Sequence, residues 1–307
     1  MIFTYNKFYY NSIIMNIIDC FMYYDEDIIL DIRLNLLDKY VSHFVICEAN
    51  FNHNGTKREL IFDISKFKKF QDKIIYIPLN HQPKNLLRIN NEDSQLIKNS
   101  KTLDNALLRE NFQRNFLFTK IRDFNENDLV IISDADEIPN LENFKYKSKI
   151  TIFKQKMFYY KLNLLHQNFI WYGSKICKKK HLKSPQWLRN IKAKKYPLWR
   201  ADIFFSKTKY NDICFLENGG WHFTNMKTPE KIDFKMKNFL HHLEYEESGL
   251  GIKDLKRIMA EKKVFYNHSA DKSEKKWNVS LKLIKAHDEI LPSYVKNNKE
   301  KFKEWID

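Results

Sequence analysis

The chain has 307 residues and a formal net charge of +15, from 53 Lys and Arg against 38 Asp and Glu. Hydrophobic residues make up 43% and aromatic residues 15%, which is enough for a packed core and excludes a disordered chain. The 6 glycines form neither a G-x-G-x-x-G nor a G-x-x-x-x-G-K-[ST] pattern, so dinucleotide-binding loops and P-loops are excluded. Any phosphate must therefore be held by side chains or by a metal ion.

The N-terminal sequence and the cysteine spacing indicate in which cellular compartment the protein is expected. Residues 1–14 lack the basic region and the apolar stretch of a signal peptide, so we expect a short extension followed by a single domain over residues 15–307. The 4 cysteines match no metal-binding spacing, which favours free thiols in a reducing compartment. No run reaches the roughly 18 apolar residues of a membrane span. We therefore expect a cytoplasmic protein whose contact with a membrane is at most peripheral.

The first half of the chain alternates strand and helix patterns. Asp25 is a candidate cap for a helix, a second, long helix is predicted over residues 103–122, and residues 80–100 are predicted to be a loop. Continuous apolar runs predict buried strands at residues 16–21, 44–48, 73–78 and 128–133. Such strands, separated by helices, are typical of α/β proteins. We therefore predict a Rossmann-like, mostly parallel central sheet flanked by helices.

After Pro139 the pattern changes. Thr228 followed by Pro229 predicts the start of a helix, and two more helices are predicted over residues 252–263 and from residue 280 to the C-terminus. Shorter runs rich in Phe and Tyr predict strands at residues 150–153, 157–162 and 203–205. The C-terminal part of the domain is therefore expected to be helical.

The segment from Lys175 to Arg200 is the most basic part of the chain, and Trp187 and Trp199 lie within it. Three interpretations stay open. The segment could bind nucleic acid, it could form an acceptor-side wall for a phosphorylated ligand, or its lysines could simply be solvated.

Asp134 and Asp136 follow the fourth predicted strand, in the segment Ser133-Asp134-Ala135-Asp136-Glu137-Ile138-Pro139. Ligands of open parallel sheets bind at the carboxyl ends of the strands, so both aspartates can face one crevice. Carboxylate oxygens are the ligands that Mg²⁺ and Mn²⁺ prefer, and these ions bridge to substrate phosphates. The segment therefore predicts a divalent metal site beside a phosphate-bearing ligand; the alternative is a polar loop that caps a strand.

Two further segments carry candidate site residues. In Gly219-Gly220-Trp221-His222, the glycines let backbone pass close to a ligand, His222 is a third candidate metal ligand, and Trp221 can stack on a sugar. On the long predicted helix, Arg109 and Gln113 share a face that can meet a nucleotide. The alternative for that helix is a solvated face on which Glu110 pairs with Arg114.

These segments together resemble glycosyltransferase family 17. The resemblance covers residues 16–307 and is carried, in chain order, by Asp19-Cys20-Phe21, Phe44-Val45-Ile46-Cys47-Glu48-Ala49-Asn50, Arg109-Glu110-Asn111-Phe112-Gln113-Arg114-Asn115, the segment around Asp134, and Gly220-Trp221-His222. It implies a type-A glycosyltransferase fold, a UDP-GlcNAc-like donor, Mn²⁺ or Mg²⁺, and inversion at the anomeric carbon. It also implies that residues 15–140 bind the nucleotide-sugar and residues 141–307 bind the acceptor.

The resemblance assigns roles to single residues. Asp134 and Asp136 take the metal and the donor, with His222 as the third metal ligand. The donor pocket is implied to include Asp19, Glu48, Arg109 and Gln113. Candidates for acceptor binding are Trp221, Trp187 and Trp199, and candidates for the general base are Glu217, Glu137 and Asp202.

The N-terminus of this sequence differs from that of the animal members of the family, and this difference bears on the expected acceptor. The animal members of the family begin with a membrane anchor and stem that this sequence does not show, so we expect a bacterial or viral enzyme that acts on a glycan or a lipid-linked acceptor. The alternatives are a basic nucleic-acid-binding protein and a non-catalytic module that binds a glycan or a nucleotide-sugar.

Overall fold

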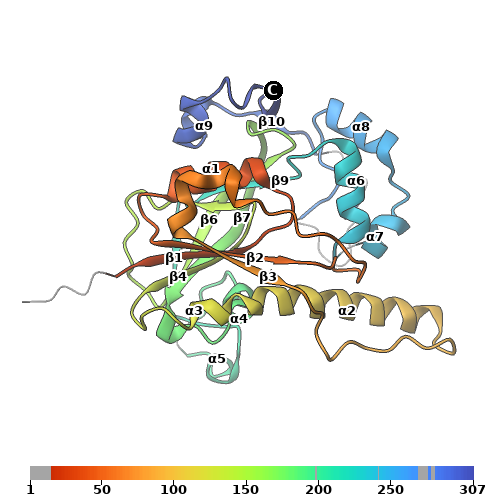
Figure 1. Ribbon diagram of the computed structural model, residues 1–307, viewed down its shortest axis with the longest axis horizontal. Helices are drawn as coiled ribbons and strands as arrows, with labels where there is room; N and C mark the ends of the chain where they lie inside the picture. Colours follow the sequence, from red (N-terminus) through yellow and green to blue (C-terminus); the bar gives the residue numbers. More distant parts are fainter. Residues whose placement is uncertain (1–14, 198, 241, 269–275, 278–280) are drawn as a thin grey trace, which may run out of the picture.

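The protein is seen in a computed structural model that describes residues 15–197, 199–240, 242–268, 276–277 and 281–307. The predicted extension, residues 1–14, lies outside the described residues. One curled sheet with the strand order β3-β2-β1-β4-β7-β6-β9-β5 forms the centre of the protein, and helices cover both of its faces (Figure 1). The α/β prediction is therefore confirmed.

The N-terminal half of the sheet is parallel. It is built from β1 (Ile17–Met22), β2 (His43–Ala49), β3 (Ile74–Leu79) and β4 (Leu129–Asp134). Most of the side chains of β1, β2 and β4 are buried, since both faces of this half are covered. All four strands lie where continuous apolar runs predict them.

The helices of this half are α1 (Asp27–Leu37), α2 (Gln95–Phe116) and α3 (Phe118–Ile121), with a 3₁₀ segment at Ile64–Lys73. Two predictions need correction. The loop predicted for residues 80–100 ends earlier, because Ser94 caps α2 by accepting a hydrogen bond from the Ile97 backbone N–H. Asp25 does not cap α1: Glu26 is the residue before the helix, and Asp25 pairs with Lys227.

The C-terminal half of the sheet is mixed rather than parallel. β6 (Ile150–Tyr159) and β7 (Leu164–Lys178) form an antiparallel pair, and β7 continues the sheet antiparallel to β4. β8 (Ile213–Leu216), β9 (Gly220–Thr224), β5 (Glu137–Pro139) and β10 (Ile284–Lys285) complete it. The strands predicted at residues 150–153 and 157–162 are therefore one strand. β7 escapes prediction because its middle residues are polar or aromatic and partly exposed.

The remaining helices are short. They are α4 (Pro185–Asn190), α5 (Asp202–Phe205), α6 (Pro229–Asn238), α7 (His242–Glu247), α8 (Ile252–Ala260) and α9 (Ser293–Asn297). The predicted start of α6 is confirmed, because Thr228 Oγ1 accepts a hydrogen bond from the Lys231 N–H. Residues 203–205 belong to a helix and not to a strand. Residues 281–307 form short turns around β10 and α9 rather than one helix.

Gly220 fixes the contact between β9 and β5. Its φ is +123°, and a Cβ at this position would lie 2.1 Å from the Ile138 carbonyl oxygen. The glycine therefore lets two strands approach, whereas the sequence predicted a close approach to a ligand. This contact sets His222 opposite Glu137 in the sheet register.

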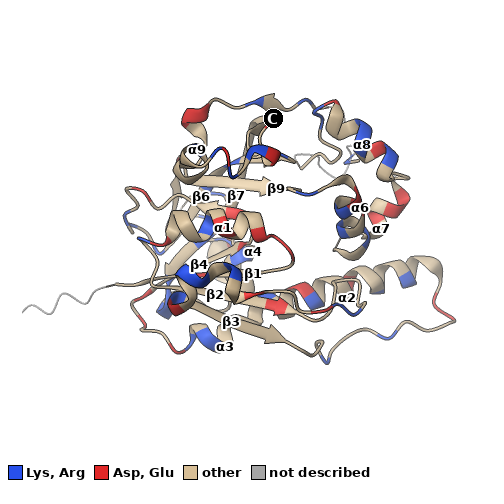
Figure 2. Ribbon diagram, turned by 45° about the horizontal axis from the view of Figure 1, so that its top comes forward, with Lys and Arg blue, Asp and Glu red and all other residues tan. Residues whose placement is uncertain are grey.

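Apolar layers lie on both faces of the parallel strands. One layer includes Ile18, Cys20 and Val130, and the other includes Phe21, Leu34 and Ile131. Because both faces are filled, the carboxyl edge of the parallel strands is the place for polar chemistry. Charged residues are spread over the surrounding helices and loops (Figure 2). In the part of the chain that the structure describes, no helix is both long and apolar enough to span a membrane.

Candidate active site

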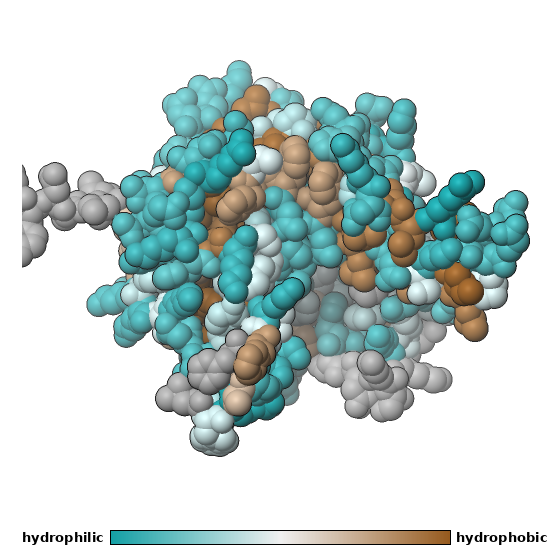
Figure 3. All heavy atoms as spheres, turned by 90° about the horizontal axis from the view of Figure 1, so that it is seen from below, coloured by the Kyte–Doolittle hydropathy of each residue, from teal (hydrophilic) through white to brown (hydrophobic). Residues whose placement is uncertain are grey.

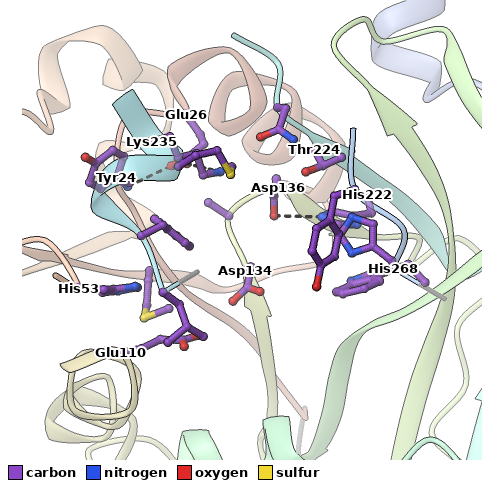
Figure 4. Close-up of a pocket in the computed structure, with 18 of the residues that line it drawn as sticks. Tyr24, Glu26, His53, Glu110, Asp134, Asp136, His222, Thr224, Lys235 and His268 are labelled. Carbon is purple, nitrogen blue, oxygen red and sulfur yellow. Dashed lines mark hydrogen bonds and ion pairs between the residues drawn. The ribbon is translucent and has the colours of Figure 1, made fainter. Parts of the chain in front are cut away.

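A pocket of about 480 Å³ opens at the carboxyl ends of β1 and β4 (Figure 4). The β4–β5 loop supplies Asp134 and Asp136 to its wall, and His222 comes from β9. The other polar lining residues include Glu26 beside α1, Glu110, Gln113 and Arg114 from α2, Arg189 from α4, and Lys235 from α6. Of the predicted site residues, the structure thus brings Asp134, Asp136, His222 and Gln113 together.

Asp134 lies between two arginines. Arg114 Nη2 is 3.0 Å from one carboxylate oxygen, and Arg189 Nη2 is 2.6 Å from the other. Burial alone would raise the pKa of Asp134, but Arg189 and Arg114 hold it well below its usual value. Asp134 is therefore an anion at neutral pH, and it orients two guanidinium groups at the pocket wall.

Arg114 also pairs with Glu110 on its own helix, at 2.7 Å. The pairing that the sequence left as an alternative is thus present, but it lies at the pocket wall and not on a solvated face. The Arg114 side chain is only 3% exposed.

Beneath the aspartate loop, Arg33 forms a fully buried frame. Its guanidinium makes two hydrogen bonds to Asp19, with Nε 2.7 Å and Nη2 2.5 Å from the two carboxylate oxygens, and both side chains are 0% exposed. Arg33 also donates to the Ser133 hydroxyl and to three backbone carbonyls of the loop, at Asp134, Ala135 and Glu137. This arrangement fixes the backbone that carries both pocket aspartates.

Glu137 supports the loop from the other side. Its carboxylate accepts hydrogen bonds from the Asp134 N–H at 3.0 Å, from the Trp171 indole at 2.6 Å and from Arg189 at 2.5 Å and 2.9 Å. The residue is 0% exposed and does not line the pocket. With its oxygens engaged in this way, Glu137 is a positioning residue, which does not fit the predicted role of general base.

Asp136 lies beside His222 at the pocket wall (Figure 4). Its Oδ1 lies 3.5 Å from His222 Nε2, and no arginine contact to Asp136 is seen among the described residues. Burial would raise the pKa of Asp136, but His222 and Lys235 keep it below its usual value. Asp136 is thus an anionic carboxylate, and none of the Lys or Arg side chains that the structure describes forms a close ion pair with it.

Several buried polar atoms of the pocket wall have no hydrogen-bond partner within the described structure. They are His53 Nδ1, Arg114 Nε, His222 Nδ1 and Asn225 Oδ1. Buried polar groups without partners are costly, and in native proteins a bound water or ion or a catalytic role commonly accounts for them. Their gathering in one pocket points to a polar ligand.

Aromatic rings form a large part of the remaining wall. Trp171 stacks on His222 with 4.8 Å between ring centroids. The other lining Phe, Tyr and Trp residues are Tyr23, Tyr24, Tyr159, Phe239, Phe265, Tyr266 and Trp277. A pocket lined by both charged groups and aromatic rings suits a ligand that joins phosphate to sugar or base.

Three predicted donor-binding residues lie outside the pocket. Asp19 is held by Arg33. Glu48 is fully buried and accepts hydrogen bonds from Arg58 and Tyr76, at 3.0 Å and 2.9 Å. Arg109 donates to Gln82 at 2.7 Å and to the His53 carbonyl at 3.1 Å, which ties two loops together.

Two predicted base candidates also lie outside the pocket. The side chain of Glu217 is 72% exposed and pairs with Lys154. Asp202, at the start of α5, is bound by Arg200 and Lys209 and does not line the pocket.

None of the three predicted acceptor tryptophans lines the pocket. The Trp221 indole donates to the Ile290 carbonyl, and the Trp187 indole donates to the Lys207 carbonyl. Trp199 is 84% exposed.

The basic residues of the segment from Lys175 to Arg200 lie in different places in the structure and have different partners. Arg189 reaches the pocket, and Lys175 is buried and donates to the carbonyls of Arg189 and Ile191. Burial lowers the pKa of Lys175 to about 7. Lys179 is likewise engaged, with the carbonyls of Arg122 and Phe124. The segment is thus not a continuous basic surface for nucleic acid.

Sequence reasoning missed Arg33, Arg189, Lys235 and Glu26 as site residues. For Arg33 a signal exists, because a charge interrupts the buried apolar pattern of α1 and such a charge needs a buried partner. Lys235 gives a similar signal on the buried face of α6.

The curled mixed sheet, flanked by helices and with charged residues at the carboxyl ends of its parallel strands, is consistent with a glycosyltransferase-type fold. The chain belongs to glycosyltransferase family 17, whose family model matches residues 7–305. By family it is a glycosyltransferase, and the predicted resemblance is confirmed.

Curated relatives are similar over part of the chain. The β-1,4-mannosyl-glycoprotein 4-β-N-acetylglucosaminyltransferases of Homo sapiens and Rattus norvegicus are 29% identical to it over 119 residues, and that of Mus musculus is 28% identical. Each alignment covers 36% of this chain and 19% of the relative. The chain thus matches about a fifth of the length of these relatives.

Proposed function

We propose that this protein transfers N-acetylglucosamine from UDP-GlcNAc to a glycan or glycolipid acceptor, with inversion and with a divalent metal ion. The observation that carries the proposal is the pocket in which Arg114 and Arg189, both paired with Asp134, lie near Asp136 and His222. Arginine forks bind phosphate groups with two parallel hydrogen bonds. The similar human and rat enzymes are N-acetylglucosaminyltransferases, which supports N-acetylglucosamine as the sugar.

The charges of the pocket support a divalent cation. The lining carboxylates are Glu26, Glu110, Asp134 and Asp136, whereas the lining Lys and Arg side chains are Arg114, Arg189 and Lys235. A diphosphate would add further negative charge to this acidic wall. A divalent cation would balance it and would neutralise the charge that develops on the leaving diphosphate.

Asp136 and His222 fit the role of metal ligands, because one supplies an oxygen and the other a nitrogen at the same wall. Asp134 fits less well, since both of its carboxylate oxygens are bound by arginines. The described residues contain no group of three or more His, Cys, Asp or Glu side chains that could hold a metal ion. Donor phosphates and water would therefore complete the ligand set, as is usual for Mg²⁺.

Glu26 is the lining carboxylate that suits the general base. Arginines bind Glu110 and Asp134, and Asp136 is assigned to the metal. Glu26 Oε2 accepts hydrogen bonds from the backbone N–H groups of Tyr24 and Asp25, whereas Oε1 lies 3.9 Å from Lys235 Nζ and 4.0 Å from Lys227 Nζ, beyond hydrogen-bond distance of both. Oε1 would take the proton of the acceptor hydroxyl, which attacks the anomeric carbon opposite the leaving UDP.

Glu26→Gln is expected to lower the rate of transfer by about 100-fold or more, the usual contribution of a general base. Its binding of UDP should be unchanged, because glutamine keeps the shape and an oxygen acceptor. Glu217→Gln and Asp202→Asn are matched controls and should retain transfer within about twofold, since exposed substitutions away from the site have small effects. Initial rates and UDP titrations of the three variants test this. A wild-type rate for Glu26→Gln would exclude Glu26 as the base.

The experiment that tests the proposed function is nucleotide release. The purified protein is incubated with Mn²⁺ and a panel of UDP- and GDP-sugars, with and without EDTA. We expect UDP release from UDP-GlcNAc that EDTA abolishes, since a metal ion stabilises the leaving diphosphate. Release that EDTA does not affect would contradict the metal. Selective release from a different nucleotide-sugar would contradict the donor.

A further inference from the structure

The loop between α4 and β8, residues 191–212, carries two of the most exposed large apolar side chains that the structure describes. Trp199 is 84% exposed and Phe205 is 90% exposed. The loop contains α5 and projects from the lower end of the molecule (Figure 1). We call residues 191–212 the α5 loop. Two such side chains within seven residues of one loop make the loop a candidate interaction site.

The same loop is strongly basic. It contains six Lys and Arg residues against two Asp residues. Asp202 is neutralised within the loop by Arg200 and Lys209. The exposed lysines that remain are Lys192, Lys194, Lys195 and Lys207. The two aromatic side chains are therefore surrounded by positive charge.

The base of the α5 loop is well anchored. Tyr196 is 8% exposed, and the cationic groups of Arg200 and Lys209 lie 5.5 Å and 5.8 Å from its ring centroid. Trp187 holds the loop to the body through the Lys207 carbonyl at 2.9 Å. The loop is thus built to present Trp199 and Phe205 outward, and these contacts do not depend on either ring.

We propose that the α5 loop binds the surface of an anionic lipid membrane, with Trp199 and Phe205 inserted at the headgroup level and the lysines facing the acidic lipids. Tryptophan prefers the membrane interface, and lysine stems can lie along apolar surface while their ammonium groups stay in water. Basic residues next to inserted aromatic rings add attraction to anionic headgroups.

A membrane explains the loop better than a nucleic acid does. A nucleic-acid strand is normally held in a basic groove with rings along it, whereas the α5 loop projects from the body. The face seen from below is largely hydrophilic, with apolar side chains in separate places (Figure 3). The α5 loop begins two residues after Arg189, which lines the pocket. Membrane binding would therefore bring one wall of the pocket toward the lipid surface, where a lipid-linked acceptor would be found.

Sedimentation with lipid vesicles tests this proposal on the full chain. Vesicles of phosphatidylcholine alone are compared with vesicles that also contain phosphatidylglycerol, at low and high salt. We expect binding to the anionic vesicles only, and we expect it to weaken with salt. Changing Trp199→Ser and Phe205→Ser together should lower binding by about tenfold or more. Changing Lys194→Gln and Lys195→Gln together should also lower it by more than about tenfold.

Leu96→Ser is the matched control, because Leu96 is 82% exposed but lies at the start of α2. It should bind vesicles like the parent protein, and all variants should keep the parent melting temperature. Unchanged vesicle binding in the Trp199 and Phe205 variant would overturn the proposal, as would binding to neutral and anionic vesicles alike. Equal binding to a single-stranded oligonucleotide, lost in the lysine variant but not in the aromatic one, would instead indicate a nucleic-acid surface. The assay needs no donor sugar, so its outcome is independent of the proposed transfer.

Discussion

Asp136→Asn is expected to lower sugar transfer by at least about 100-fold while leaving the fold intact. The reason lies in what the carboxylate contacts. His222 Nε2 lies 3.5 Å from its Oδ1, and the side chain is 15% exposed at the pocket wall. Asparagine has the same shape but no charge, so it would remove the proposed anionic metal ligand and leave the pairing of Asp134 with its two arginines in place.

Asp134→Asn should behave differently. This change leaves Arg114 and Arg189 facing each other without the anion that now separates them. We expect it to reduce transfer and also to lower the free energy of unfolding by about 2 kcal/mol, the scale of a lost charge-assisted hydrogen bond. The two variants thus separate the proposed role of Asp136 in metal binding from the role of Asp134 in orienting arginines.

The comparison is made by measuring initial transfer rates over a series of Mn²⁺ concentrations, together with urea unfolding of each variant. Glu217→Gln serves as a control for the loss of a carboxylate at an exposed site. Transfer by Asp136→Asn at the parent rate in saturating Mn²⁺ would show that Asp136 does not bind the metal. Loss of stability in Asp136→Asn similar to that of Asp134→Asn would show that the two residues share one structural role.

The parallel half of the sheet could be predicted because each of its strands is a continuous apolar run, and such runs form where both sheet faces are covered. The mixed half could not. β7 has exposed polar and aromatic residues in its middle, and β6 changes register twice against it. Its pairing depends on β-bulges and on distant partners that no local pattern indicates.

The site shows the same division. The structure brings Asp134, Asp136 and His222 together at one pocket, and each has a local signal in the sequence, in the end of a strand or in a histidine that closely follows a glycine pair. Asp19 and Glu48 also lie in apolar strands, but each is bound by an arginine outside its own strand, Arg33 and Arg58. A buried carboxylate needs a partner, and the sequence alone does not tell whether that partner is a ligand or a side chain.

Arg33→Met is expected to have the largest effect on stability, lowering the free energy of unfolding by about 3–5 kcal/mol, the usual cost of leaving a buried charge unpaired. Methionine fills similar space, but Asp19 would lose its partner, and the carbonyls of the aspartate loop would lose their donor. The backbone under Asp134 and Asp136 would then be free to shift, so transfer should fall as well.

Two companion variants test why Arg33→Met lowers the free energy of unfolding, which is measured by urea unfolding monitored with circular dichroism. Arg33→Lys keeps the charge but cannot reproduce the planar fork, so it should be intermediate and should remain folded even where the methionine variant does not. Combining Arg33→Met with Asp19→Asn removes the unpaired charge, so the double variant should lose less stability than the two single losses added together. A loss below about 1 kcal/mol for Arg33→Met would be the size expected of an exposed ion pair. That result would mean that the aspartate loop keeps its shape without the arginine, and that the pocket is organised by Arg114, Arg189 and Glu137 alone.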